Sequence, residues 1–109
     1  MQAHEVVLIG FGAIGSAVFE KMSSHEGIRI SHVVVSEHQL EPVQQRLGAR
    51  ARAVTQVPAS STLVLECAGH SALEQHVLPA LARGTECAIL SIGALAADDL
   101  PVRLEAAAR

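Results

Sequence analysis

Aromatic residues are almost absent from this sequence, and so is any surplus of positive charge. Among its 109 residues there are two phenylalanines, no tryptophan and no tyrosine, and the formal net charge is −3. Binding of single-stranded nucleic acid uses aromatic stacking platforms, and nucleic-acid binding in general uses a basic stripe. The arginines are scattered and form no such stripe. We therefore expect no nucleic-acid partner.

Long apolar runs are missing too, and cysteine is scarce. No stretch approaches the roughly 20 apolar residues of a membrane-spanning helix, and the N-terminus lacks the basic-then-apolar pattern of a secretory signal. Of the two cysteines, Cys67 falls on an expected strand and Cys87 directly precedes one. Buried, reduced thiols fit them better than a disulfide or a metal site. We expect a cytoplasmic protein with no membrane partner and no metal.

What the sequence does contain is aliphatic. Half of the residues are hydrophobic, and alanine, valine, leucine and isoleucine supply most of them. A chain of this length forms one domain that buries roughly two-thirds of its unfolded surface. The composition is typical of a sheet covered by helices.

A strand pattern changes to a helical one at a glycine-rich turn, in the segment VVLIGFGAIGSAV. Residues 6–9 are typical of a strand buried on both faces of a parallel sheet. Ile14, Val18 and Met22 then follow with the spacing of one apolar helix face. The motif G-x-G-x-x-G therefore lies on a strand-to-helix turn, the context in which it indicates dinucleotide binding.

The glycines of this turn, Gly10, Gly12 and Gly15, have separate physical roles. Gly10 lets the chain turn tightly, Gly12 lets a pyrophosphate approach the backbone, and Gly15 lets the helix pack closely. The N-terminus of the helix then faces the phosphates. The alternative is a glycine-rich turn that binds no nucleotide. We predict a Rossmann-like α/β three-layer sandwich with a mostly parallel sheet.

The end of the second expected strand, over residues 30–35, bears on the choice of cofactor. In dinucleotide-binding folds an acidic side chain about 20 residues beyond the glycines binds the adenosine ribose. Glu37 occupies this place, and no arginine lies at positions 36–39. A carboxylate repels a 2′-phosphate, so the sequence favours NAD over NADP. The alternative is that Glu37 is a solvated loop carboxylate.

The rest of the chain continues the alternation of helices and strands. We expect a helix over 40–47 ended by Gly48, a short edge strand over 50–54, a strand over 63–67, a helix from the cap Ser71 to Gly84, a strand over 88–92, and a last helix that begins at Asp98 or Asp99. Pro79 lies inside one of these helices and should kink it or break a turn.

The turn after the strand 63–67 should open on the same crevice as the glycines. Ala68 and Gly69 are small enough for a nicotinamide ribose to lie against the backbone. His70 could bind the cofactor or a substrate there, or could bond locally at the start of the helix. Glu66 and Cys67 point to opposite faces of a strand, so they do not converge on a metal ion. The other histidines are scattered without any ligand spacing.

Three segments, VVLIGFGAIGSAV, LVLECAGHSALEQH and ILSIGAL, together resemble the N-terminal half of L-aspartate dehydrogenases. The resemblance implies an enzyme that oxidises L-aspartate to iminoaspartate with NAD or NADP, supplying NAD biosynthesis. It also implies a second domain that holds the substrate and supports a homodimer. The residues implied to line the pyrophosphate are Gly10, Ile14, Gly12, Ala13 and Gly15, and those towards the nicotinamide are Ala68, Gly69 and His70.

The catalytic histidine of that family has no counterpart before Arg109, so no catalytic residue is assigned. The last helical pattern reaches Arg109 without a stop signal. We therefore expect residues 1–109 to form a dinucleotide-binding domain truncated before the substrate domain, and inactive alone.

Other interpretations of the sequence retain the dinucleotide-binding fold but change the function. Homoserine dehydrogenases and dihydrodipicolinate reductases also place a small-residue turn after a comparable strand. A regulatory NAD-sensing module, of the kind attached to ion transporters, has a similar length and glycine motif. The segment ECAGH followed by a capped helix favours a dehydrogenase.

Overall fold

The structure is a computed structural model that describes residues 4–24, 27–61, 63–68 and 72–89. In chain order the elements are β1 (His4–Ile9), α1 (Ala13–Ser23), β2 (Ile28–Val34), the short 3-10 turn η1 (Glu37–Gln39), α2 (Leu40–Leu47), β3 (Arg52–Val54), β4 (Leu63–Glu66), the π-helical segment η2 (Leu73–Val77), α4 (Leu78–Ala82) and β5 (Glu86–Ile89).

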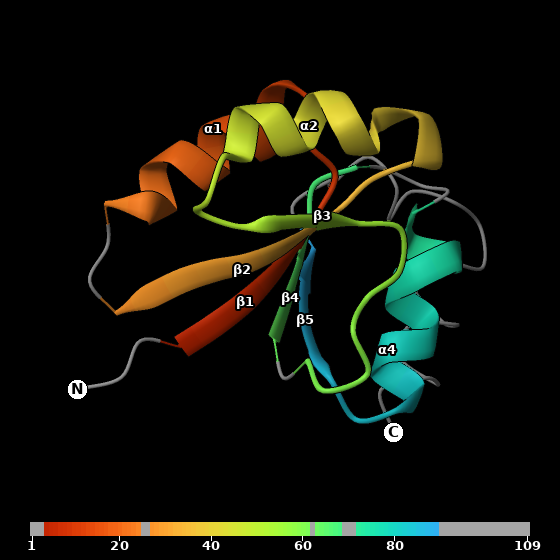
Figure 1. Ribbon diagram of the computed structural model, residues 1–109. Helices are drawn as coiled ribbons and strands as arrows, with labels where there is room; N and C mark the ends of the chain where they lie inside the picture. Colours follow the sequence, from red (N-terminus) through yellow and green to blue (C-terminus); the bar gives the residue numbers. More distant parts are fainter. Residues whose placement is uncertain (1–3, 25–26, 62, 69–71, 90–109) are drawn as a thin grey trace.

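One five-stranded sheet organises these elements, with the strand order β3-β2-β1-β4-β5 (Figure 1). Every strand pairs in parallel with its neighbours. The order reverses between β1 and β4, because the chain builds outwards from β1 to one edge and then crosses to the other side. In open α/β sheets, ligands bind outside the carboxyl ends of the strands at such a point.

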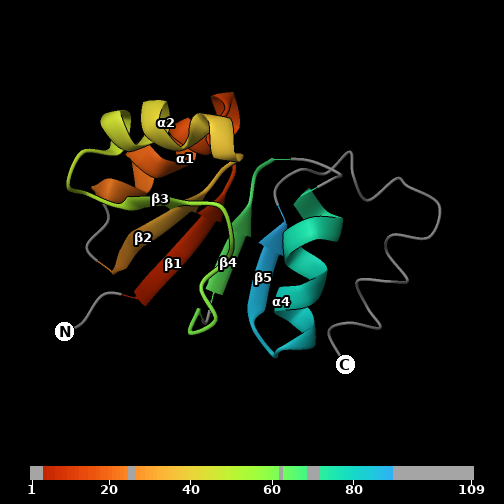
Figure 2. The same ribbon diagram turned by 45° about the vertical axis from the view of Figure 1, so that its right-hand side comes forward.

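Helices cover both faces of this sheet, which confirms the expected three layers. In Figures 1 and 2, α1 and α2 lie on one face and α4 on the other. Leu8 packs with Phe19 of α1, whereas the next residue, Ile9, packs with Val77 of η2. Both faces of β1 are therefore buried over residues 6–9, as the uniform apolar sequence there predicts. Within the described residues, no helix has both the length and the apolar character to cross a bilayer.

Helix α1 buries a different face from the expected one. Its buried residues are Gly15 and Phe19, with Val18 and Met22 packed in part against the same cluster. Ile14, expected to share the face of Val18 and Met22, is 56% exposed, so that prediction was wrong. The first turn of α1 packs on the glycine loop through Gly15 and leaves Ile14 outside the core.

The strands agree with the predicted ones apart from their ends. The second strand is observed over Ile28–Val34, and β3 is an edge strand, as expected, but begins at Arg52. Arg50 instead belongs to the turn after α2, because its amide donates to the carbonyl of Leu47 at 3.2 Å. Strand β5 begins at Glu86, two residues earlier than predicted.

The predicted irregularity at Pro79 is confirmed. The π-helical η2 precedes α4, whose second residue is Pro79. Proline has no N–H to donate to the preceding turn, and its ring collides with that turn, which favours the wider π-helical spacing there. The predicted cap Ser71, the end of the strand over 88–92 and the last helix lie outside the described residues.

Candidate cofactor-binding crevice

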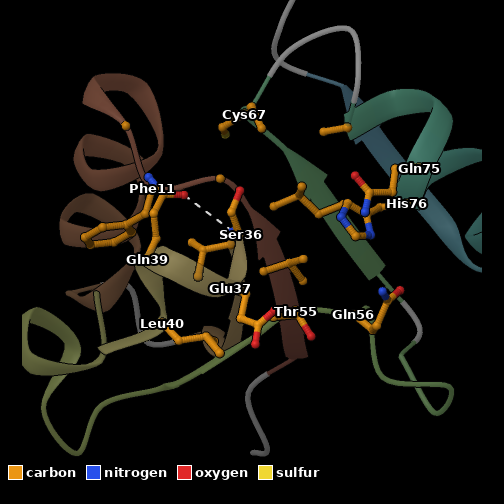
Figure 3. A pocket seen from close by; sticks show the side chains of 17 residues that line it. Phe11, Ser36, Glu37, Gln39, Leu40, Thr55, Gln56, Cys67, Gln75 and His76 are labelled. Atoms are coloured by element: carbon orange, nitrogen blue, oxygen red, sulfur yellow. Dashed lines mark hydrogen bonds between the residues drawn. The ribbon is translucent and has the colours of Figure 1, made fainter. Parts of the chain in front are cut away.

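A crevice of about 830 Å³ opens at the carboxyl ends of the strands (Figure 3). The glycine loop, the segment after β2, the segment after β3, the end of β4 and η2 all contribute to it. Its lining residues are Ile9, Gly10, Phe11, Gly12, Val34, Val35, Ser36, Glu37, Gln39, Leu40, Thr55, Gln56, Cys67, Ala68, Ala72, Gln75 and His76. The crevice thus lies at the point of the sheet where the strand order reverses.

Close backbone packing shapes the glycine loop. Gly10 has a φ of +93°, and a Cβ there would lie 2.7 Å from the Cβ of Ala68. A Cβ on Gly15 would collide with the carbonyl oxygen of Gly10, so the first turn of α1 sits directly on the loop. The structure therefore confirms that Gly10 makes a tight turn and that Gly15 allows close helix packing.

Gly12 differs from the other two glycines of the motif. A Cβ at Gly12 would meet no atom within 4 Å, so protein packing gives no reason for a glycine there. Gly12 lines the crevice and is the N-cap of α1, without a side chain to bond the free amides of the first turn. Ala13 and Ile14 are exposed at this helix end and are not part of the described lining. Open space and free amides at one helix N-terminus suit an anionic group.

The segment after β2 places Ser36 and Glu37 in the lining. Ser36 caps η1: its side chain accepts a hydrogen bond from the Gln39 backbone, and its own amide donates to Gln39 Oε1 at 3.4 Å (Figure 3). The capped turn holds Glu37 at the crevice. Among the described lining residues Glu37 is the only acidic one, and none is lysine or arginine.

The end of β4 carries a buried carboxylate. Glu66 is fully buried, and its Oε2 accepts a hydrogen bond from the amide of Ala68 at 2.7 Å. This bond holds Ala68 in the turn that packs against Gly10. Cys67 packs on the opposite face, with the cluster that contains Phe19, so the expected divergence of Glu66 and Cys67 is confirmed. The described residues contain no group of three potential ligands that could hold a metal ion.

Both cysteines are half-buried free thiols. Burial, together with the negative charge of Glu66, raises the pKa of Cys67 to about 11. Burial also raises the pKa of Cys87 to about 11, against the opposing effect of Arg83. With such pKa values both thiols are protonated at neutral pH. The prediction that the cysteines are packed is confirmed, and their low reactivity stays a prediction.

The sequence analysis gave His76 no role, yet η2 places it in the lining beside Gln75 (Figure 3). His76 is 9% exposed, and burial lowers the pKa of its imidazole. The crevice therefore has an uncharged imidazole in its wall at neutral pH. Regular helical spacing gave no signal for His76, because the segment that carries it is π-helical. The other predicted residues of this side, Gly69 and His70, lie outside the described residues.

Together the parallel sheet, the reversal of strand order and the glycine loop define a Rossmann-like dinucleotide-binding domain. A sequence model of the family described as "Homoserine dehydrogenase, NAD binding domain" matches residues 10–109. The chain belongs to this family of NAD-binding domains.

Among curated proteins, the chain is similar to the L-aspartate dehydrogenase of Pseudomonas aeruginosa, with 43% identity over 109 residues. That match covers 95% of this chain and 41% of the enzyme, so the chain spans less than half the length of its relative. The resemblance to L-aspartate dehydrogenases is thus confirmed for the NAD-binding domain.

Solved structures establish the same fold. The aspartate dehydrogenase of Thermotoga maritima superposes with a TM-score of 0.66 at 22% identity, over 98% of this chain and 42% of that one. The WlbA dehydrogenase of Chromobacterium violaceum, in complex with NADH and UDP-GlcNAcA, gives a TM-score of 0.78 at 15% identity, over 97% and 32%.

Proposed function

We propose that the crevice binds NAD(H), with the pyrophosphate over Gly10, Gly12 and the first turn of α1. The observation that carries this proposal is Gly12, which lines the crevice and whose missing Cβ faces open space. Ala13, Ile14 and Gly15 would offer backbone amides to the phosphates from the helix N-terminus. Membership of an NAD-binding family supports the identity of the ligand.

This placement of the pyrophosphate also determines where the two ends of the cofactor would lie. Glu37, held at the crevice by the capped turn η1, would accept hydrogen bonds from the adenosine ribose. A lining with this carboxylate and no described cation disfavours a 2′-phosphate, so NAD is preferred and NADP is the weaker ligand. Ala68, with Gly69 and His70 beyond it, would lie towards the nicotinamide.

For the whole protein we propose an NAD-dependent L-aspartate dehydrogenase that forms iminoaspartate for NAD biosynthesis. The support is the 43% identity to an enzyme of that name and the resemblance of the ECAGH and SIGAL segments. In this proposal residues 1–109 are the cofactor domain, and a further domain holds L-aspartate and forms the homodimer. The enzyme would be cytoplasmic, with no nucleic-acid or membrane partner.

Calorimetric titration of the 109-residue chain with NADH tests cofactor binding, and Gly12→Ala is the decisive variant. A methyl group at position 12 fills the space for the pyrophosphate and meets no protein atom, so affinity should fall at least about ten-fold while the unfolding temperature stays within a few degrees. NADPH should bind the wild-type chain more weakly than NADH.

The matched control is Ala17→Ser, which also adds one heavy atom to α1 but at an exposed position outside the lining. It should bind NADH like the wild-type chain. The proposal would be contradicted if no binding were detected at NADH concentrations up to about 1 mM. A Kd of that size corresponds to a binding free energy of only about −4 kcal/mol. A Gly12→Ala variant with unchanged affinity would contradict the proposal as well.

The substrate is tested on the complete gene product. NAD reduction that depends on L-aspartate, and not on homoserine, is the expected result. Reduction with homoserine instead would move the protein to the other dehydrogenase class while leaving the cofactor proposal intact. The 109-residue chain alone should reduce no NAD with L-aspartate.

A further inference from the structure

The two aromatic residues of the chain pack on each other, and an arginine lies over each ring: Arg46 of α2 over Phe11, and Arg50, in the turn after α2, over Phe19. The rings of Phe11 and Phe19 meet edge to face, with centroids 5.7 Å apart and an angle of 70°. The guanidinium carbon of Arg46 lies 4.7 Å from the Phe11 centroid, and that of Arg50 lies 4.8 Å from the Phe19 centroid. At such distances a guanidinium over a ring face is attracted by the ring quadrupole.

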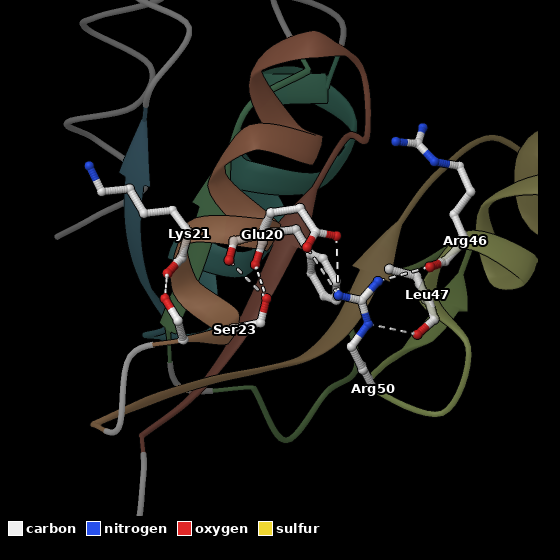
Figure 4. Close-up of polar contacts among 8 residues, drawn as sticks. Glu20, Lys21, Ser23, Arg46, Leu47 and Arg50 are labelled. Atoms are coloured by element: carbon white, nitrogen blue, oxygen red, sulfur yellow. Dashed lines mark hydrogen bonds and ion pairs between the residues drawn. The ribbon is translucent and has the colours of Figure 1, made fainter.

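The Arg50 half of this arrangement belongs to the core. Phe19 is 2% exposed, and Arg50 donates to the carbonyls of Leu47 and Arg46 at 3.2 and 2.9 Å. Arg50 also forms an ion pair with Glu20 at 3.1 Å (Figure 4). These contacts fasten the end of α2 to α1, so the role of Arg50 is structural.

The Arg46 half belongs to the crevice. Phe11 lies between Gly10 and Gly12 in the glycine loop and lines the crevice. The side chain of Arg46 points away from Arg50 in Figure 4. Among the described residues its guanidinium makes no hydrogen bond or ion pair, and its contact is the ring of Phe11. The described contact of the Arg46 side chain is therefore with the glycine loop.

We propose that Arg46 is a positioning residue for the cofactor, which holds Phe11 from α2 and so keeps the glycine loop ready for the pyrophosphate. Phe11 is the one side chain between two glycines, and Arg46 adds a second contact to the edge-to-face contact that Phe11 makes with Phe19. A loop that is held less firmly would have to be ordered on binding, and this ordering would cost affinity. The inference rests on the proposed binding of NAD(H).

The experiment compares two arginines that lie at similar distances from a phenylalanine ring but differ in their other contacts. Arg46→Met keeps a long apolar side chain over Phe11 but removes the charge, and should raise the Kd for NADH roughly two- to five-fold, the range of an exposed cation–π contact. Its unfolding temperature should change little. Arg50→Met should give the opposite result: a lower unfolding temperature and an unchanged Kd.

A double-mutant cycle with Phe11→Leu separates positioning from simple charge attraction. If Arg46 acts through the ring, Arg46→Met has no further effect on Kd once Phe11 is leucine. A guanidinium that attracted the phosphates directly would show the same loss of affinity in both backgrounds, and this loss would fade with added salt.

Two results overturn the inference. One is an Arg46→Met variant that binds NADH like the wild-type chain, and the other is a loss of affinity that is equally large without Phe11. In both cases wild-type binding shows that the proposed function stands. Absence of NADH binding by the wild-type chain would instead remove the proposed function and this inference together.

Discussion

Gly10 and Ala68 approach so closely that a Cβ on the glycine would lie 2.7 Å from the Cβ of the alanine. The two residues follow β1 and β4, which pair in parallel at the centre of the sheet. The proposed phosphate side and the proposed nicotinamide side of the crevice are therefore fixed to one another by direct contact. A substitution at either residue should therefore alter both sides of the crevice.

Gly10→Ala should destabilise the chain strongly, by about 1–3 kcal/mol for the positive φ and by a further amount for the steric collision. Urea unfolding gives the free energy. Ala68→Gly should restore only part of the loss, because the Cα and amide nitrogen of residue 68 would remain 2.9 and 3.1 Å from the new Cβ. Equal stability of Gly10→Ala and wild type would show that the loop can move away from β4.

The glycine loop is the part of the site that local sequence predicts best. Its strand, turn and helix each have a strong signal within a few residues, and the steric reasons for Gly10 and Gly15 are general ones. The strand ends are less predictable, since they depend on partners elsewhere. Gln44 of α2 shows this: its side chain bonds the amide of Ala53 and the carbonyl of Ala51 at 2.8 and 3.0 Å, and so sets where β3 begins.

The opposite wall of the crevice could not be predicted in the same way. His76 enters the lining from the π-helical η2, which precedes the helix that contains Pro79, and the spacing of a regular helix does not describe such a segment. The Arg46 contact with Phe11 depends on the packing of α2 over α1, and residue spacing does not specify that packing. The sequence alone identified the glycine motif. The side chains that support the motif could be identified only from the fold.

The two thiols should react slowly with a disulfide reagent. At pH 8 a thiol with a pKa of about 11 is about 0.1% thiolate, roughly a hundredth of the fraction at the ordinary value of 9.0. The reaction rate should rise about ten-fold for each pH unit up to about pH 10 and then level off above the pKa. Single-cysteine variants, Cys87→Ala and Cys67→Ala, let absorbance report each rate alone.

NADH should distinguish these two cysteines. Cys67 lines the crevice, whereas Cys87 lies on β5 outside the lining, so saturating NADH should slow the reaction of Cys67 and leave that of Cys87 unchanged. Protection of both thiols would instead mean that the cofactor tightens the whole fold. Fast reaction of either thiol at neutral pH would contradict its raised pKa.

Stability should fall as the pH drops below the ordinary histidine pKa of 6.5, because burial lowers the pKa of His76 in the folded chain. The unfolded chain then binds a proton on His76 while the folded chain still does not. The stabilisation is fully present above pH 6.5 and is lost progressively as the pH falls towards the folded pKa. Urea unfolding between about pH 5 and pH 8 measures this slope.

His76→Gln should flatten that slope, because glutamine keeps a polar side chain but does not titrate. His38→Gln is the matched control: His38 is exposed on η1, so its replacement should leave the wild-type slope in place. Carboxylates contribute to acid unfolding in all three proteins alike, and the difference between the two variants isolates the imidazole in the crevice wall. If both variants kept the full slope, His76 would bind its proton equally well in the folded and the unfolded chain. Water would then have to reach the imidazole in η2 more freely than its burial implies.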